Sequence, residues 1–117
     1  MSRFNFADRL LTQTEKRGNP LCLGLDPHVS LLPQFVMGKT DEKTNRVKSI
    51  EAFIISYIDL IADKVPAVKT QAAFFEQYGS AGMQILFDVS SYAQEKGLLV
   101  ILDAKRSDIG STAKAYA

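Results

Sequence analysis

Short apolar runs alternate along the chain with longer segments of helical periodicity. Apolar runs at 21–26, 65–75 and 98–103 predict three buried strands, and the last is the clearest because it is continuous and follows a glycine. Apolar residues recur every three or four positions at 3–17, 44–64 and 79–97, which predicts three helices. Thr44 or Asn45 is the expected N-cap of the second helix, and the polar stretch 27–43 before it is predicted to be a loop.

The order of these elements predicts parallel strands joined by right-handed βαβ crossovers. A doubly wound sheet would usually carry a glycine-rich phosphate loop after its first strand, but "LDPHVS" contains no G-x-G-x-x-G pattern. A (β/α)₈ barrel instead collects functional residues at the carboxyl ends of several strands. Charged residues occupy such positions here: Asp26, Lys69, Asp103 and Lys105. The predicted class is therefore α/β, the N-terminal part of a TIM barrel, with about three βα units after helix 3–17.

The length of the chain sets a further expectation. A complete barrel needs about 250 residues, whereas these 117 residues supply three of the eight strands. The last segment, "STAKAYA", favours a helix with Ser111 or Thr112 as N-cap and has no stop signal. We expect residues 1–117 to be the N-terminal portion of a larger protein, and the alternative is a short α/β protein with an unusual C-terminus.

The amino-acid composition excludes some classes of protein but does not indicate a function. With 46% hydrophobic residues and a formal net charge of +1, the chain is typical of a globular protein and not of a basic nucleic-acid binder. No apolar run approaches the roughly 18 residues that a membrane span needs. The single cysteine, Cys22, fits a reducing cytoplasm and is expected to pack inside the first strand.

The stretch "ILDAKRSDIGST" places two negative and two positive charges at the end of the third strand and in the residues that follow it. Asp103 and Lys105 point to the same side if strand geometry continues that far, and Lys69 stands on the neighbouring strand. The result would be a Lys-Asp-Lys row in which the carboxylate helps to keep both amines protonated. Asp108 lies beyond the turn, where strand geometry does not place it. Taken alone, D-x-K-x-x-D is also compatible with a solvated charged loop.

Three segments, "LCLGLDP", "VKTQAAFFEQYG" and "DAKRSDIGSTAKAYA", together resemble orotidine 5′-phosphate decarboxylase of the bacterial type. The resemblance implies a (β/α)₈ homodimer that converts orotidine 5′-phosphate to UMP and CO₂ without a metal or an organic cofactor. It implies a catalytic network of Lys69, Asp103, Lys105 and Asp108, in which Lys105 stabilises and protonates a carbanion at C6. It also implies that Asp26 and Lys69 hold the ribose hydroxyls, that Thr112 joins them from the partner subunit, and that Asp108, Ile109 and Thr112 reach into the partner's site.

Two rival interpretations remain open. One is a Mg²⁺-dependent sugar-phosphate decarboxylase or aldolase-like enzyme of a related barrel, although Lys69 stands where such enzymes carry an acidic metal ligand. The other is a partial barrel that acts only as an assembly module. The family's phosphate-binding groups have no counterpart in these residues, so we expect the 117-residue chain alone to be inactive. The role of Glu76, an isolated acid after the second strand, is left open.

Overall fold

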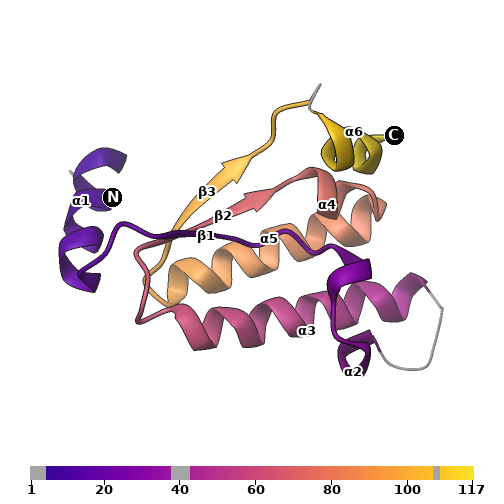
Figure 1. Ribbon diagram of the computed structural model, residues 1–117, viewed down its shortest axis with the longest axis horizontal. Helices are drawn as coiled ribbons and strands as arrows, with labels where there is room; N and C mark the ends of the chain where they lie inside the picture. The colour runs from indigo at the N-terminus through magenta and orange to yellow at the C-terminus, as the bar shows by residue number, and fades with distance from the viewer. Residues whose placement is uncertain (1–4, 38–42, 107–108) are drawn as a thin grey trace.

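The chain folds as three parallel strands with helices on one face of the sheet (Figure 1). The computed structural model describes residues 5–37, 43–106 and 109–117. The strands are β1 (Cys22–Gly24), β2 (Ala67–Gln71) and β3 (Leu99–Asp103), in the order β1-β2-β3. The helices are α1 (Phe6–Arg17), α2 (Gln34–Met37), α3 (Lys43–Ile61), α4 (Ala73–Glu76), α5 (Gly79–Glu95) and α6 (Gly110–Tyr116), with a 3₁₀ turn at Val29–Leu31.

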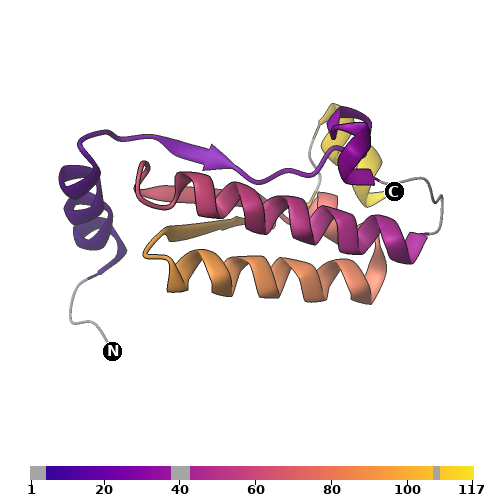
Figure 2. The same cartoon turned by 90° about the horizontal axis from the view of Figure 1, so that it is seen from below.

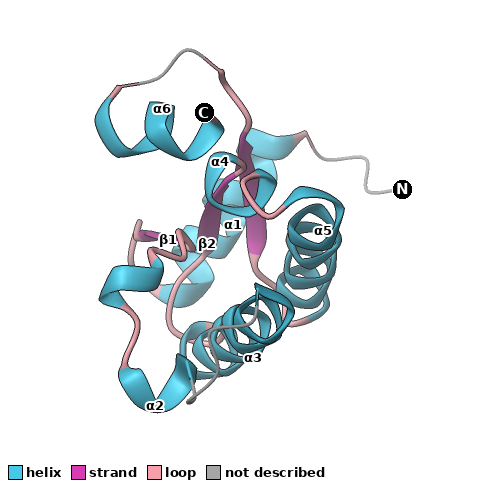
Figure 3. Ribbon diagram, turned by 90° about the vertical axis from the view of Figure 1, so that its right-hand side faces the viewer, coloured by secondary structure: helices cyan, strands magenta, loops and turns pink. Residues whose placement is uncertain are grey.

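The hydrophobic core lies between the sheet and the two long helices, α3 and α5. These helices run side by side along the strands in Figure 2, and Figure 3 shows both on the same side of the sheet. The apolar stripe of each helix supplies the core, as the helical spacing predicts. The large buried side chains of the core include Ile50, Ile54, Ile58, Val68, Phe75, Val89 and Leu98.

The two ends of the sheet are occupied by different helices. Helix α1 lies at the amino ends of the strands, and α6 lies at their carboxyl ends against α4 (Figure 1). Asn5 is the N-cap of helix α1, and its side-chain oxygen accepts a hydrogen bond from the Asp8 N–H at 2.9 Å. Arg17, the last residue of α1, donates two hydrogen bonds to the Ala62 carbonyl, at 3.2 and 2.9 Å. These bonds tie α1 to the turn that leads into β2.

Several predicted boundaries differ from the structure. The second strand ends at Gln71 and is followed by the short helix α4, whereas the apolar run to residue 75 predicted a strand throughout. Helix α3 already begins at Lys43, so Thr44 and Asn45 lie inside it. Helix α6 has Ile109 as its N-cap, so Ser111 and Thr112 lie in its first turn. The predicted loop 27–43 contains the 3₁₀ turn and α2.

The strands are less buried than the apolar runs predicted. Only β2, the central strand, is largely buried, because it has a neighbour on each side. The first strand is three residues long and mostly exposed, and Cys22 is exposed instead of packed. The register of the strands explains this exposure. Cys22 pairs with Ala67 and Gly24 with Lys69, and paired residues of neighbouring strands point to the same face of the sheet. Cys22 therefore shares with Lys69 the face that turns away from α3 and α5. Helix α1 likewise buries no residue, with Phe6 and Leu11 left 45% and 63% exposed.

Candidate active site

Lys69 and Asp103 stand together at the carboxyl end of the sheet. Strands β2 and β3 pair in parallel, with Lys69 opposite Ile101 and Gln71 opposite Asp103. Since side chains two residues apart share a face, Lys69 and Asp103 point to the same side, away from the helices. Their Nζ and Oδ2 atoms are 3.7 Å apart, and the two side chains are 42% and 33% exposed. The predicted pairing of these two charges across adjacent strands is therefore present in the structure.

The backbone around this pair is fixed by hydrogen bonds between neighbouring strand ends. The Leu25 N–H donates to the Lys69 carbonyl at 2.8 Å, and the Ala72 N–H donates to the Asp103 carbonyl at 2.9 Å. Asp26 accepts a hydrogen bond from the Gln71 N–H at 3.2 Å through its carboxylate. Asp26 is thus held at the same end of the sheet as Lys69 and Asp103, as its position after the first strand predicts.

Lys105 lies beyond the end of the third strand. Strand β3 ends at Asp103, so the alternation that would aim Lys105 with Asp103 does not extend to it. Its N–H contacts the Asp103 carboxylate at 3.4 Å, while its side chain is exposed. Within the described ranges, no carboxylate lies within 4.0 Å of the Lys105 ammonium. The structure therefore brings two members of the predicted Lys-Asp-Lys row together and leaves the third on an adjoining loop.

The remaining predicted site residues lie on or before α6. Asp108 falls outside the described residues. Ile109 is the N-cap of α6 and is 85% exposed, and Thr112 is half-buried in the first turn of that helix. The prediction that they serve a partner subunit stays a prediction.

An ion pair that the sequence analysis missed joins the loop after β3 to α4. The Arg106 guanidinium donates from Nη2 to Glu76 Oε2 at 2.8 Å and from Nη1 to the Ala104 carbonyl at 2.8 Å. It also lies over the Tyr116 ring of α6, 5.4 Å from the ring centroid. The hydrogen bond to Glu76 raises the pKa of Arg106 above its already high value. Glu76 reaches Arg106 only because α4 turns the chain at residues 73–76. No pattern in the sequence predicts the pairing of residues 76 and 106.

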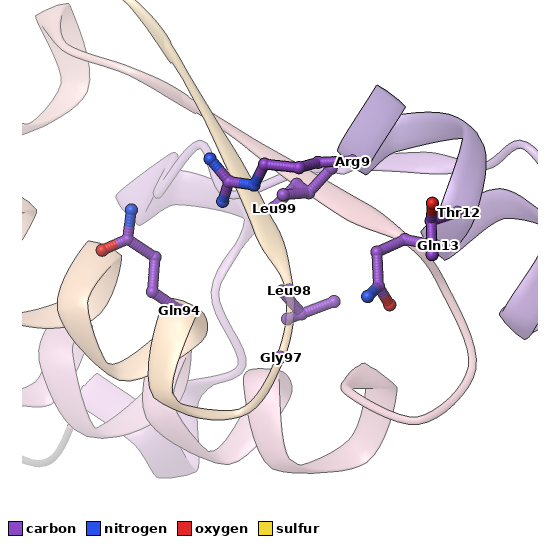
Figure 4. A pocket seen from close by; sticks show the side chains of 7 residues that line it. All are labelled: Arg9, Thr12, Gln13, Gln94, Gly97, Leu98 and Leu99. Atoms are coloured by element: carbon purple, nitrogen blue, oxygen red, sulfur yellow. The ribbon is translucent and has the colours of Figure 1, made fainter. Parts of the chain in front are cut away.

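A pocket lies at the opposite end of the sheet (Figure 4). It has a volume of about 530 Å³ and is lined by α1 residues Arg9, Thr12 and Gln13, by Gln94 of α5, and by Gly97, Leu98 and Leu99 at the start of β3. Because Leu99 begins β3 and Asp103 ends it, this pocket is separated from the charged strand ends by the length of the strand. We therefore assign the candidate chemistry to the carboxyl end.

In the part of the chain that the structure describes, no three His, Cys, Asp or Glu residues are grouped so as to hold a metal ion. Over the same residues, every helix is too short or too polar to cross a bilayer.

Comparison with known proteins shows which protein family this chain resembles. The family model described as "Orotidine 5'-phosphate decarboxylase / HUMPS family" matches residues 19–117. An orotidine 5′-phosphate decarboxylase of Rhodopirellula baltica is 47% identical over 116 residues, a match that covers 96% of this chain and 38% of that protein.

Solved structures share the fold as well as the sequence. The crystal structure of a Streptomyces avermitilis protein assigned as an orotidine 5′-phosphate decarboxylase matches with 40% identity and a TM-score of 0.75, covering 99% of this chain and 38% of its own. The Leishmania donovani OMP decarboxylase matches with 32% identity and a TM-score of 0.64, covering 97% of this chain and 38% of its own.

The fold and the charged strand ends thus define an α/β protein that corresponds to the N-terminal part of a TIM barrel. The chain belongs to the orotidine 5′-phosphate decarboxylase / HUMPS family. It spans 38% of the length of the curated relatives it matches.

Proposed function

We propose that these residues form part of an enzyme that decarboxylates orotidine 5′-phosphate to UMP and CO₂ in pyrimidine biosynthesis. The observation that carries the proposal is the 3.7 Å pair of Lys69 and Asp103 at the carboxyl ends of adjacent parallel strands. Active residues of TIM barrels occupy such strand ends. Relatives that cover nearly the whole chain bear the name orotidine 5′-phosphate decarboxylase, which supports this substrate over others.

The chemistry requires a cation near the reacting carbon. Loss of CO₂ from C6 of the pyrimidine leaves a carbanion that no ring carbonyl absorbs directly. An ammonium beside C6 stabilises this charge as it develops and then delivers a proton, and Lys105 is the residue we assign to both roles. Lys69 holds the Asp103 carboxylate in place and, with Asp26, binds the ribose hydroxyls.

Asp103 is assigned a smaller, electrostatic role. Two unit charges about 4 Å apart interact by roughly 4 kcal/mol at an effective dielectric constant near 20. That energy corresponds to about a thousandfold in rate, whereas enzymes commonly lower barriers by about 8–23 kcal/mol. Repulsion between Asp103 and the departing carboxylate therefore falls short, and stabilisation of the carbanion by Lys105 must contribute more.

The proposed enzyme is a cytoplasmic homodimer with shared active sites. Ile109, a large apolar side chain, is 85% exposed, and burial against a second copy would remove that surface from water. In the proposal, Asp108, Ile109 and Thr112 enter the partner's site, where Thr112 contacts ribose. The cytoplasm is the assigned compartment because the lone Cys22 fits a reducing environment. The proposal involves neither nucleic acid nor a membrane.

Activity is expected only with the rest of the barrel. The chain covers 38% of the length of its relatives. The family resemblance implies that the groups that bind the substrate phosphate have no counterpart among these residues. Binding energy from that remote phosphate contributes to the transition state. We therefore propose that the 117-residue chain alone does not turn over substrate. A solely structural role as an assembly module would instead leave the natural polypeptide inactive.

A second candidate function belongs to a related barrel, and the matched family description carries a second name, HUMPS, beside the decarboxylase. A Mg²⁺-dependent sugar-phosphate decarboxylase or aldolase of a related barrel would need an acidic ligand on β2. Lys69 occupies that strand, and its ammonium repels a cation. The proposal of a metal-independent reaction is favoured for that reason.

The test uses the polypeptide as the cell makes it. Purified protein is mixed with orotidine 5′-phosphate, and release of CO₂ and formation of UMP are measured with and without EDTA. We expect equal turnover in both conditions. The proposal is contradicted by the absence of decarboxylation, and activity that EDTA abolishes and Mg²⁺ restores would favour the second candidate.

A further inference from the structure

Arg106 connects three segments that are distant in the sequence. Its guanidinium pairs with Glu76 on α4 at 2.8 Å, donates to the Ala104 carbonyl at 2.8 Å, and lies over the Tyr116 ring on α6. A planar guanidinium can make such contacts together because its N–H groups form a rigid fork and its face stacks on aromatic rings. An ammonium at this position could not reproduce all three.

These contacts lie on both sides of Lys105. The ladder of β3 ends at Asp103, whose carbonyl accepts the hydrogen bond from the Ala72 N–H. Beyond that bond, the side chain of Arg106 holds its own residue against α4 and fixes the carbonyl of Ala104. Lys105 is the single residue between these two anchored positions, so its backbone has little freedom to move.

We infer that Arg106 is a positioning residue: through Glu76 and Tyr116 it holds the loop of Lys105 and thereby sets where the Lys105 ammonium stands relative to the Lys69–Asp103 pair. The functional part of this inference rests on the proposed decarboxylase activity. The guanidinium and carboxylate are 55% and 39% exposed, and ion pairs so exposed add little to global stability. Loss of Arg106 should therefore affect the placement of Lys105 far more than it affects folding.

The first experiment measures the loop independently of activity. Endoproteinase Lys-C cuts after Lys105, and its recognition of lysine is unchanged by substitution of the next residue with methionine. In the natural polypeptide, Arg106→Met should raise the rate of cleavage after Lys105 by about 10-fold, because the loop opens locally more often. Arg9→Met is the matched control, since Arg9 is an exposed arginine at the opposite end of the sheet, and it should leave that rate unchanged.

The second experiment measures kcat and KM for orotidine 5′-phosphate decarboxylation. Arg106→Met should lower kcat by about 10- to 100-fold, the order of loss that a misplacement near 1 Å causes, with KM and Tm close to those of the unsubstituted protein. Arg106→Lys should recover part of kcat, because its ammonium still pairs with Glu76 but cannot also hold the Ala104 carbonyl. The double variant Glu76→Gln/Arg106→Met should be no slower than Arg106→Met alone.

Failure of the inference about Arg106 can be distinguished from failure of the proposed decarboxylase activity. Unchanged cleavage after Lys105 in Arg106→Met overturns the inference, whatever the activity. Unchanged kcat, a loss confined to KM, or a fall in kcat that follows a fall in Tm also overturns it. If the unsubstituted polypeptide does not decarboxylate the substrate while cleavage still rises in Arg106→Met, Arg106 positions the loop and the proposed function is the part that fails.

Discussion

Gly82 of α5 lies against the backbone of α4, and replacing it with alanine tests how tightly these helices are packed. A Cβ atom at this position would stand 1.8 Å from the Phe75 carbonyl oxygen and 2.9 Å from the Tyr78 Cβ. The nearest atom belongs to the backbone, so a change of rotamer cannot relieve the overlap. Gly82 itself is buried, at the N-terminal end of the packed face of α5.

Two physical effects of Gly82→Ala have opposite signs. Alanine favours a helix over glycine by about 1 kcal/mol, so helix propensity alone predicts a more stable protein. Ordinary contact begins near 3.4 Å, so relief of the overlap requires α4 and α5 to separate by about 1.6 Å. Overpacking of a core costs roughly 1–3 kcal/mol and occasionally more. Because the overlap involves backbone, we expect a cost at the upper end and a net destabilisation of about 2 kcal/mol or more.

Urea unfolding of the natural polypeptide, followed by circular dichroism, measures this free energy. Ser80→Ala is the matched control, because Ser80 is exposed in the first turn of α5 and its substitution adds no atom against α4. The control should change the free energy of unfolding by less than about 0.5 kcal/mol. A Gly82→Ala protein that is as stable as the parent, or more stable, would refute the close approach of α4 and α5.

Two further substitutions test other contacts. Arg17→Met should lower the free energy of unfolding by about 1.5–3 kcal/mol in urea titrations, because two charged hydrogen bonds to the Ala62 carbonyl are lost; an effect no larger than that of Lys16→Met would contradict it. Asp59 accepts the hydrogen bond of the Tyr92 hydroxyl and raises the pKa of Tyr92 above its usual value near 10. This stabilisation is complete below pH 10 and is lost as pH rises through the raised pKa, so Tyr92→Phe should flatten the fall of Tm above pH 10, and parallel Tm profiles would exclude the contact.

The pairing of Lys69 with Asp103 could be predicted from the sequence because it depends on two simple regularities. Strands joined by a helix lie parallel, and side chains alternate between the faces of a strand. Together they place Lys69 and Asp103 on one face at neighbouring strand ends, as the structure has them. The same reasoning could not place Lys105, because strand geometry ends at Asp103.

The features that sequence reasoning missed depend on tertiary structure. An apolar run does not reveal which strand lies at the edge of a sheet or which face is covered, so Cys22 was expected to be packed and is exposed. The small residues before Phe74 predicted that the second strand continues, so α4 was not predicted. Without α4, nothing in the sequence brings Glu76 to Arg106, 30 residues further along the chain.

Turnover of an alanine variant tests whether Lys105 stabilises and protonates the carbanion at C6. In the natural polypeptide, release of CO₂ from carboxyl-labelled orotidine 5′-phosphate is compared with UMP binding measured by calorimetry. We expect Lys105→Ala to abolish turnover and still bind UMP, while Lys16→Ala, at the far end of the molecule, keeps the parent rate. A Lys105→Ala enzyme that releases CO₂ at the parent rate would rule out this role for Lys105.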